Sequence, residues 1–293
     1  MLSLRGSMVA LVTPFRDGKV DEAALRQLAR WQVEKGTDGL VPCGTTGEGA
    51  TLASEEAVRV VRICVEEARG RVPVIAGCGT NSTQATIENV QRAKEAGADA
   101  ALVVTPYYNK PTQEGLFRHF EVVARSGGLP VVVYNVPSRT SVDLLPETIG
   151  RLSRVAGIAG VKEASGNIVR VAEIQEKCEG RPFAILAGDD MFTLPTLAMG
   201  GHGVVSVVAN VAPGDLATLC DDFFAGRLEA AQKAQVRFAP LVRALFCETN
   251  PLPVKHALHR MGRIGPELRL PLVPVSEKGA AQVESALKAY GLT

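Results

Sequence analysis

Three observations in the sequence predict an α/β fold, a (β/α)8 TIM barrel with a C-terminal helical domain. Eight short apolar runs, rich in β-branched residues, recur along the chain. Successive runs start 20 to 33 residues apart, which is roughly the length of one βα unit. The runs are continuously apolar rather than alternating, which is typical of parallel strands that are covered on both faces.

The expected strands follow one another through the first 210 residues. They lie at 8–14, 39–44, 72–79, 100–106, 130–137, 158–165, 183–190 and 203–210. Segments with helical periodicity separate them, at 21–36, 54–70, 81–99, 112–127, 144–155 and 167–180. An open doubly wound sheet is the alternative arrangement, but the GxGxxG turn expected after its first strand is missing.

Several helix ends carry recognisable signals. Asp21 is the expected N-cap of the first helix. Ser54 opens the second with an incomplete capping box, because Ala57 rather than glutamate stands three residues later. Pro146 suits a first helical turn, and Gly180 is a usual stop signal.

The strand pattern stops near residue 215. The segments 215–246, 250–262 and 276–291 are instead expected to be helical. We therefore expect a catalytic barrel over residues 1–225 and a C-terminal helical domain over residues 226–293.

Composition excludes several classes of function. The net charge is +1, and no basic run is present, so neither nucleic acid nor a membrane surface is an expected partner. The six cysteines are scattered without a CxxC pair, which argues against zinc and a disulfide framework. No signal peptide or apolar span is recognised. A soluble, cytoplasmic protein without a metal is the expectation.

Chemistry in such a barrel lies at the carboxyl ends of the strands. These ends bring together a lysine, tyrosines, hydroxyl groups, a glycine-rich loop and an arginine, with no histidine. The residues concerned are Thr45, Thr46, Tyr107, Tyr108, Tyr134, Arg139, Lys162, Gly188 and Val205.

Lys162 follows the apolar run IAGV, where a lysine is unexpected. The amine is nucleophilic only when neutral, and dry surroundings lower its pKa from ~10.4 toward ~7–8. A neutral lysine can form a Schiff base with a ketone, which acidifies the neighbouring C–H and yields an enamine. The competing interpretation is structural, with Lys162 paired to Glu163 or Asp189.

The surrounding groups suit the same chemistry. The loop GTTGEG at 44–49 offers backbone N–H groups and hydroxyls to a carboxylate. Tyr134 could relay protons, and Arg139 could clamp a second carboxylate. Each group also has a structural interpretation: the loop as a turn, Tyr107 and Tyr108 as rim packing, and Arg139 as a solvated cation.

Other conspicuous side chains are expected to be structural. Asp189 and Asp190 lack histidine partners for a metal, so capping or exposure to solvent is expected. His256 and His259 lie on an expected C-terminal helix without a third ligand. Cys43 is a candidate nucleophile by position only.

The whole chain resembles the dihydrodipicolinate synthase (4-hydroxy-tetrahydrodipicolinate synthase) family, among the pyruvate-dependent Schiff-base aldolases. The motifs that carry the resemblance are GTTGE at 44–48, VTPYYNKP at 104–111, YNVPSRT at 134–140, GVKEASG at 160–166, LAGDD at 186–190 and GGHGVVSV at 200–207.

The resemblance implies a lyase that condenses pyruvate with L-aspartate 4-semialdehyde in diaminopimelate and lysine biosynthesis, without a cofactor. It implies the same barrel and C-terminal helices, and a homotetramer built as a dimer of dimers. N-acetylneuraminate lyase and keto-deoxy sugar-acid aldolases are the alternatives within the same class. A keto-acid sensor without catalysis is disfavoured, since Lys162, Tyr134, Thr45 and Tyr108 are all present.

The resemblance also implies a role for each site residue. Lys162 resembles the Schiff-base lysine, Tyr134 the proton-transferring tyrosine, and Thr45 its hydroxyl partner. Tyr108 resembles the tyrosine that completes the site of a neighbouring subunit. The expected substrate-binding residues are Thr46, Val205, Arg139 and Gly188, with Thr46 on the pyruvate carboxylate and Arg139 on the semialdehyde carboxylate.

Feedback by lysine is expected to be weak or absent. Lysine-inhibited members of this family tend to carry histidine and glutamate in the cleft at the dimer interface. The matching positions here hold Ser54, Ala57 and Ala85, although Asn81 and Tyr107 are retained. Inhibition by micromolar lysine would contradict this expectation.

Overall fold

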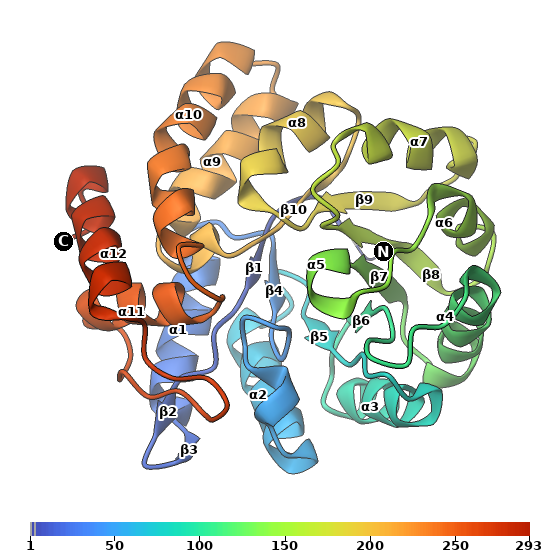
Figure 1. Cartoon of the computed structure of the whole chain (residues 1–293), viewed down its shortest axis with the longest axis horizontal. Coiled ribbons are helices and arrows are strands. Elements are labelled where there is room, and N and C mark those ends of the chain that lie inside the picture. The colour runs from blue at the N-terminus through green and yellow to red at the C-terminus, as the bar shows by residue number, and fades with distance from the viewer. Residues whose placement is uncertain (1, 3) are drawn as a thin grey trace.

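The eight expected strands form one parallel sheet that closes into a barrel (Figure 1). The computed structural model describes residue 2 and residues 4–293. The strands of the barrel are β1 (Gly6–Ala10), β4 (Gly39–Val41), β5 (Ile75–Gly77), β6 (Ala100–Val104), β7 (Val131–Asn135), β8 (Ile158–Glu163), β9 (Ala184–Ala187) and β10 (Gly203–Ser206). Their order is β4-β1-β10-β9-β8-β7-β6-β5, and a parallel bridge between Leu40 and Val74 joins the two edge strands. The barrel prediction is confirmed.

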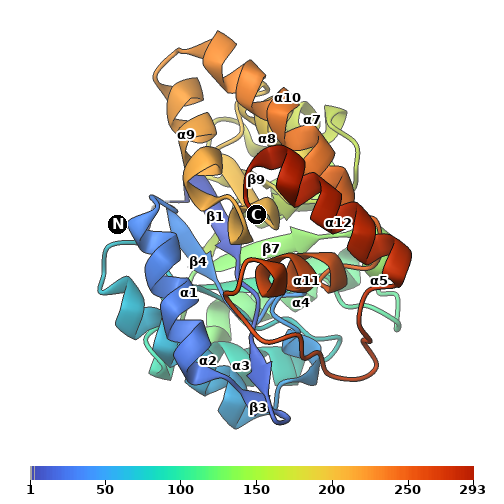
Figure 2. The same cartoon turned by 90° about the vertical axis from the view of Figure 1, so that its left-hand side faces the viewer.

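Helices surround the barrel and continue past it (Figures 1 and 2). The outer layer consists of α1 (Glu22–Glu34), α2 (Ser54–Ala68), α3 (Thr83–Glu95), α4 (Gln113–Gly127), α6 (Pro146–Leu152), α7 (Val169–Cys178), α8 (Thr193–Ala198) and α9 (Pro213–Phe224). The C-terminal helices are α10 (Leu228–Leu245), α11 (Leu252–Arg260) and α12 (Glu277–Tyr290). In this described part of the chain, every helix is too short or too polar to cross a bilayer.

The structure contains short elements that periodicity did not predict. These are the hairpin β2 (Phe15–Arg16) and β3 (Lys19–Val20), and the one-turn helix α5 (Pro137–Thr140). The helix α8 was not expected either. The segment 215–246 is two helices rather than one, because Gly226 adopts a φ of +77° between them. The expected domain boundary after residue 225 falls in this turn and stays a prediction.

One expected helix cap is wrong and another is confirmed. Helix α2 is capped by Ala53, whose backbone N–H donates to Glu56 Oε2 at 3.0 Å. The hydroxyl of Ser54 faces Arg92 instead, at 3.4 Å from its Nη1. Asp21 caps α1 as expected, since its Oδ1 accepts from Ala24 N at 3.1 Å.

Two apolar cores hold the strand ends in place. One core lies inside the barrel and includes Met8, Val132, Tyr134, Leu186 and Val205. The larger core fills the space between the sheet and the helices and extends to α10, α11 and α12. Two of the predicted site residues therefore belong to the barrel interior.

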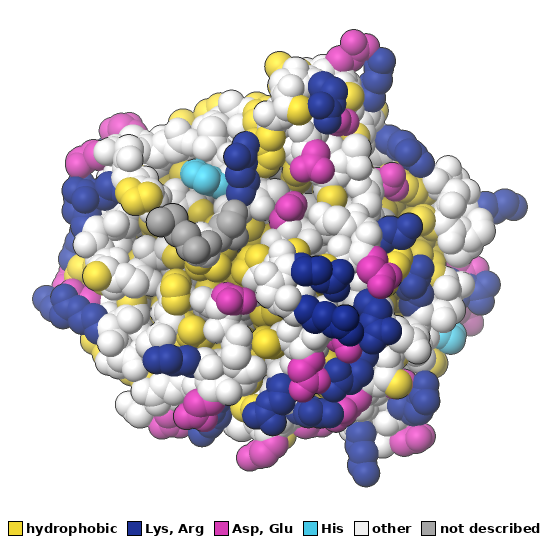
Figure 3. Space-filling view, turned by 180° about the vertical axis from the view of Figure 1, so that it is seen from behind, with side chains coloured by type: hydrophobic (Ala, Val, Ile, Leu, Met, Phe, Trp, Pro, Cys, Tyr) yellow, Lys and Arg dark blue, Asp and Glu magenta, His cyan; other side chains and the backbone are white. Residues whose placement is uncertain are grey.

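Opposite charges are interspersed on the outer surface, as the face in Figure 3 shows. Ion pairs join neighbouring helices: Arg26 on α1 contacts Glu66 on α2 at 2.5 Å, and Arg59 on α2 contacts Glu22 on α1 at 2.5 Å. Such mixed surfaces produce no extended field of one sign.

The contact between β8 and β9 requires glycine at position 160. A Cβ built on Gly160 meets Ala184 O at 2.4 Å and Ala184 Cβ at 2.9 Å. We expect Gly160→Ala to push the two strands apart and to lower the free energy of unfolding by about 1–3 kcal/mol. Urea denaturation measures this loss. Gly265→Ala is the matched control, because its Cβ meets only Phe15 O at 3.5 Å, and a loss of equal size in both variants would contradict the account.

Candidate active site

A cavity of about 540 Å³ opens at the carboxyl ends of the strands. Its walls come from the loop after β4, from β5, β6 and β7, from α2 and α3, and from the segments before and after α11. Of the residues that the sequence places at the strand ends, Thr45, Tyr107, Tyr134 and Arg139 line it directly. Lys162 lies one layer deeper, with its Nζ 4.1 Å from the centroid of the Tyr134 ring.

Lys162 is a buried amine at the end of β8. It is 6% exposed and pairs in register with Tyr134 of β7 and Leu186 of β9. Among the described residues, no ion pair includes it. Burial lowers the pKa of Lys162 to about 7, although Asp190 opposes this shift, and the charge of Arg139 lowers the pKa further. Near neutral pH, the amine can therefore lose its proton.

The two carboxylates that could have neutralised Lys162 have other partners. Glu163 accepts hydrogen bonds from Asn135 Nδ2 at 3.1 Å and from Ser165 N at 2.6 Å. Asp189 caps a short 3₁₀ helix by accepting from Met191 N at 2.8 Å, as the capping interpretation expected. The structural interpretation of Lys162 as half of an ion pair is therefore not supported.

Asp190 differs from the expectation of exposure to solvent. It is 3% exposed, bonds to the hydroxyl of Ser206, and accepts from Val207 N at 3.0 Å and Val208 N at 3.3 Å. Burial raises the pKa of Asp190 to about 6, although these hydrogen bonds lower it. Because its oxygens are occupied by β10 and the following turn, Asp190 acts on Lys162 through its charge rather than by contact.

Tyr134 keeps its proton at neutral pH. Burial raises the pKa of its hydroxyl to about 12, while the charge of Arg139 and the neighbouring Thr45 hydroxyl act in the opposite direction. A neutral phenol can both donate and accept a proton in a hydrogen-bonded chain. The hydroxyls of Tyr134 and Thr45 thus lie next to each other beside the amine.

Gly188 and Val205 shape the space around the lysine. A Cβ on Gly188 would lie 2.7 Å from Ala164 Cβ and 3.1 Å from Lys162 Cε, so a larger residue would crowd the amine's stem. The Gly188 N–H donates to Glu163 O at 2.7 Å. Val205 on β10 is 2% exposed and packs in the interior of the barrel.

The GTTGEG loop is rigid and tightly packed. Glycine at 49 and 77 is required there, because a Cβ would meet Cys43 O at 2.1 Å and 2.3 Å respectively. The Thr13 hydroxyl donates to Gly47 O at 2.7 Å. Thr46 is buried, and its hydroxyl accepts from Asn250 Nδ2 at 2.9 Å. A loop held from three sides can present its hydroxyls and N–H groups to an anion without rearranging.

Asn250 is a residue that sequence reasoning missed. It lies just before α11 and reaches two predicted substrate-binding residues. Besides its bond to Thr46, its carbonyl oxygen accepts from Arg139 Nη2 at 3.2 Å. The only signal in the sequence was an asparagine next to a proline, which indicates a turn rather than a site.

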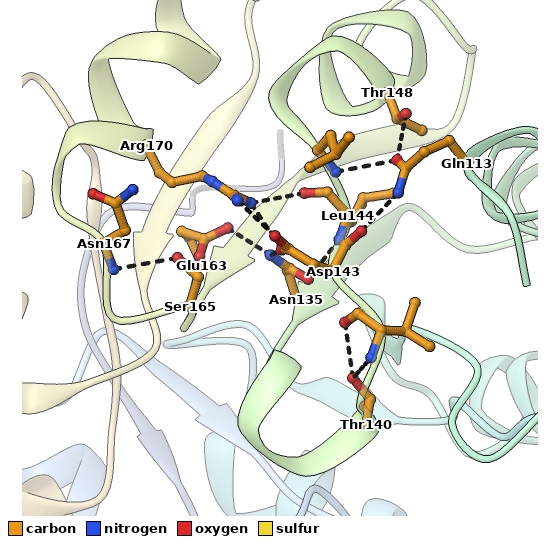
Figure 4. A network of polar contacts seen from close by, with 12 residues as sticks. Gln113, Asn135, Thr140, Asp143, Leu144, Thr148, Glu163, Ser165, Asn167 and Arg170 are labelled. Atoms are coloured by element: carbon orange, nitrogen blue, oxygen red, sulfur yellow. Dashed lines mark hydrogen bonds and ion pairs between the residues drawn. The ribbon is translucent and has the colours of Figure 1, made fainter. Parts of the chain in front are cut away.

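Asn135 is a second missed residue, next in sequence to Tyr134 (Figure 4). Its amide donates to Asp143 Oδ1 at 3.0 Å and to Glu163 Oε2 at 3.1 Å, and it accepts from Leu144 N at 3.0 Å. Arg170 neutralises Asp143 through two bonds of 2.8 and 2.6 Å. This network fastens the ends of β7 and β8, which carry Tyr134 and Lys162.

The structure does not bring Tyr108 into the cavity of its own chain. Tyr108 is 89% exposed with a φ of +71°, whereas its neighbour Tyr107 lines the cavity. Arg139 is exposed at the rim rather than buried. Tyr108 is thus available to another molecule rather than to Lys162 of the same chain.

The remaining candidates are structural. Burial raises the pKa of the Cys43 thiol to about 12, so it is a poor nucleophile. His256 Nε2 contacts Glu284 Oε1 at 3.1 Å, and His259 Nδ1 contacts Ile264 O at 3.2 Å, within the C-terminal helices. Over residue 2 and residues 4–293, no three His, Cys, Asp or Glu side chains gather as a metal-binding group would require.

The Dihydrodipicolinate synthetase family matches residues 3–290. A 4-hydroxy-tetrahydrodipicolinate synthase of Anaeromyxobacter sp. (strain K) is 56% identical over 292 residues, which cover 100% of this chain and 99% of that protein. A dihydrodipicolinate synthase of Acinetobacter baumannii, solved in complex with pyruvate, has a TM-score of 0.97 at 43% identity, covering 99% of this chain and 100% of that one.

A monomeric dihydrodipicolinate synthase variant is equally similar in structure. It has a TM-score of 0.97 at 44% identity and covers 99% of this chain and 97% of that chain. Because the family matches almost the full length of this chain, the chain belongs to the dihydrodipicolinate synthetase family.

Proposed function

We propose that Lys162 carries the condensation of pyruvate with L-aspartate 4-semialdehyde, the lyase activity of a 4-hydroxy-tetrahydrodipicolinate synthase in lysine and diaminopimelate biosynthesis. The observation that supports this most directly is the amine itself, which is buried at the end of β8 without a carboxylate partner among the described residues. Burial that brings its pKa to about 7 supplies the neutral nucleophile that the reaction needs.

The reaction begins when neutral Lys162 Nζ attacks the ketone carbon of pyruvate. Loss of water gives an imine, and loss of a methyl proton converts it into an enamine. The enamine carbon then forms the new C–C bond with the aldehyde carbon, whose oxygen takes up a proton. The amine of the semialdehyde portion finally displaces Lys162 from the imine carbon, which closes the ring and frees the lysine.

Protons for these steps pass through the hydroxyl chain beside the amine. Tyr134 shuttles them between the reacting atoms and Thr45, and Tyr108 of a neighbouring subunit links the chain to solvent. The raised pKa of Tyr134 suits this role, because the phenol returns to its protonated form after each transfer.

The substrates are held by the loop and the rim. Thr46 and its backbone receive the pyruvate carboxylate, with Gly188 and Val205 leaving room for the small keto acid beside Lys162. Arg139 at the rim receives the semialdehyde carboxylate. A sugar-acid lyase would need hydroxyl-recognising groups there, and the presence of Arg139 favours the synthase over that alternative.

The proposed assembly follows from Tyr108. An exposed tyrosine that completes another subunit's relay requires at least a dimer, and we propose a homotetramer built from two such dimers. One solved structure similar to this chain is a monomeric variant of a dihydrodipicolinate synthase. The cytoplasmic location and the weak feedback by lysine stay predictions.

Trapping with pyruvate and borohydride tests the central role of Lys162. The trapping rate should rise with pH through about 7 and then level off, because the fraction of neutral amine grows until its pKa is passed. Peptide mapping by mass spectrometry should find the adduct on residue 162, and Lys162→Ala should abolish it. An adduct on another residue, or a midpoint near 10, would contradict the proposal.

Arg139 is expected to bind the aldehyde substrate and not pyruvate. Arg139→Leu should raise KM for the semialdehyde by roughly 10- to 100-fold, the loss expected for a hydrogen-bonded charge pair. Trapping with pyruvate at pH 8 should change little. Arg139→Lys keeps the charge but loses the bidentate geometry. Its KM for the semialdehyde should lie between those of the wild type and Arg139→Leu. An unchanged KM for the semialdehyde in Arg139→Leu would favour the lyase alternative. Cleavage of N-acetylneuraminate by the wild-type enzyme would favour it as well.

Complementation tests the role of Tyr108. Lys162→Ala and Tyr108→Phe should each be nearly inactive alone. When equal amounts of the two variants exchange subunits, half of the dimers contain one subunit of each kind. Each such dimer holds one intact site out of two, so the mixture should recover about a quarter of wild-type activity. Activity that merely equals the sum of the two variants would show that Tyr108 does not act across an interface.

A further inference from the structure

We propose that Lys255, in the C-terminal helical segment, is a positioning residue for the loop that receives the pyruvate carboxylate. Through a buried ion pair with Glu48, it cancels a negative charge that would otherwise lie unpaired beside this loop. This inference rests on the proposed function, since it assumes that the GTTGEG loop binds a carboxylate.

The ion pair joins two distant parts of the chain. Lys255 lies on α11 and Glu48 lies in the GTTGEG loop, 207 residues earlier, with Nζ and Oε1 2.5 Å apart. The two residues are 1% and 3% exposed. Lys255 also donates to Thr13 O at 3.0 Å and lies over the ring of Phe15, 4.4 Å from its centroid. The amine therefore ties the segment after β1, the GTTGEG loop and α11 together.

The second carboxylate oxygen of Glu48 is held by the segment after α11. Arg269 donates its backbone N–H to Glu48 Oε2 at 3.1 Å. Its guanidinium is engaged by Glu56 of α2, through bonds of 2.7 and 2.6 Å, so it does not replace Lys255 as the counter-ion. The remaining nearby carboxylate, Glu267, accepts from Gly18 N at 2.7 Å. Lys255 is thus the cation in direct contact with Glu48.

Stability alone does not explain this pair. Burying two charges costs about as much as their attraction returns, and well-packed apolar residues can replace such pairs without loss. Glu48 also adopts a left-handed conformation with a φ of +52°, which is uncommon for a residue with a side chain. A strained residue held by a buried cation marks a position at which geometry matters.

The position of Glu48 connects the pair with substrate binding. Glu48 lines the cavity together with Thr45 and follows Thr46 by two residues. An unpaired carboxylate at this point would repel a carboxylate on the loop, because charges interact strongly where water is excluded. With Lys255 in contact the pair is neutral, and the loop's N–H and hydroxyl groups dominate the field that the anion meets.

Three full-length variants separate charge from structure. Lys255→Met removes the cation and leaves a buried carboxylate, Glu48→Gln removes the anion and leaves the cation, and the double variant removes both. KM for pyruvate, KM for the semialdehyde and kcat are measured for each. Thermal melting monitors folding, and the pyruvate concentration that half-saturates borohydride trapping gives an independent measure of binding.

The size of the change in KM for pyruvate should depend on which charge is removed. Lys255→Met should raise KM for pyruvate about tenfold or more, with KM for the semialdehyde and kcat changed less than about threefold. Glu48→Gln and the double variant should stay within about threefold of wild type for all three constants, because neither leaves an unpaired carboxylate.

Several results would overturn the inference. One is an unchanged KM for pyruvate in Lys255→Met. Another is a change of similar size in KM for pyruvate, KM for the semialdehyde and kcat of this variant. If Lys255→Met does not fold, a tenfold rise of KM for pyruvate in Glu48→Gln or the double variant decides against it. Suppose that the wild type traps pyruvate on Lys162 and that Lys255→Met reaches half-saturation of trapping at the same pyruvate concentration. This result would refute the inference about Lys255 and leave the proposed function intact. Failure of wild type to trap pyruvate refutes the proposed function as well.

Discussion

The site depends on keeping one amine dry and without a carboxylate in contact. Lys162 ends a strand whose other residues are apolar, and burial shifts its pKa to about 7 against the pull of Asp190. Ser206 and two backbone N–H groups occupy the oxygens of Asp190, so Asp190 acts on the amine through its charge and not by contact. Glu163 is likewise engaged by Asn135. The hydrogen bonds of Asp190 and Glu163 therefore keep both carboxylates out of contact with the amine.

Two polar networks hold the segments that carry the candidate site residues. In the first network, Asn135 and its partners fasten the ends of β7 and β8, which carry Tyr134 and Lys162. In the second network, Asn250 and Lys255 reach from the C-terminal segment into the loop of Thr46 and Glu48. The C-terminal segment thus contributes to the site as well as to the core, because it contacts Thr46, Glu48 and Arg139.

Much of the fold followed from periodicity, because continuous apolar runs and turn residues are local signals. The sequence also indicated Lys162 as a site residue, since a lysine that follows an apolar run is rarely buried without a partner or a function. Asn250 and Lys255 could not be found in the same way, because their partners lie more than 100 residues away. The hairpin at 15–20 and α5 are too short to show a period. The partner expected for Tyr108 belongs to another chain, so one chain cannot show it.

The most direct test of the account is the ionisation of Lys162 in the free enzyme. Protein labelled with ¹³C at lysine Cε gives an NMR signal for each lysine, and Lys162→Ala identifies the one of interest. The account predicts that this signal titrates with a midpoint near 7. A midpoint near the ordinary value of 10.5 would mean that the amine stays charged at neutral pH, which contradicts its role as the nucleophile.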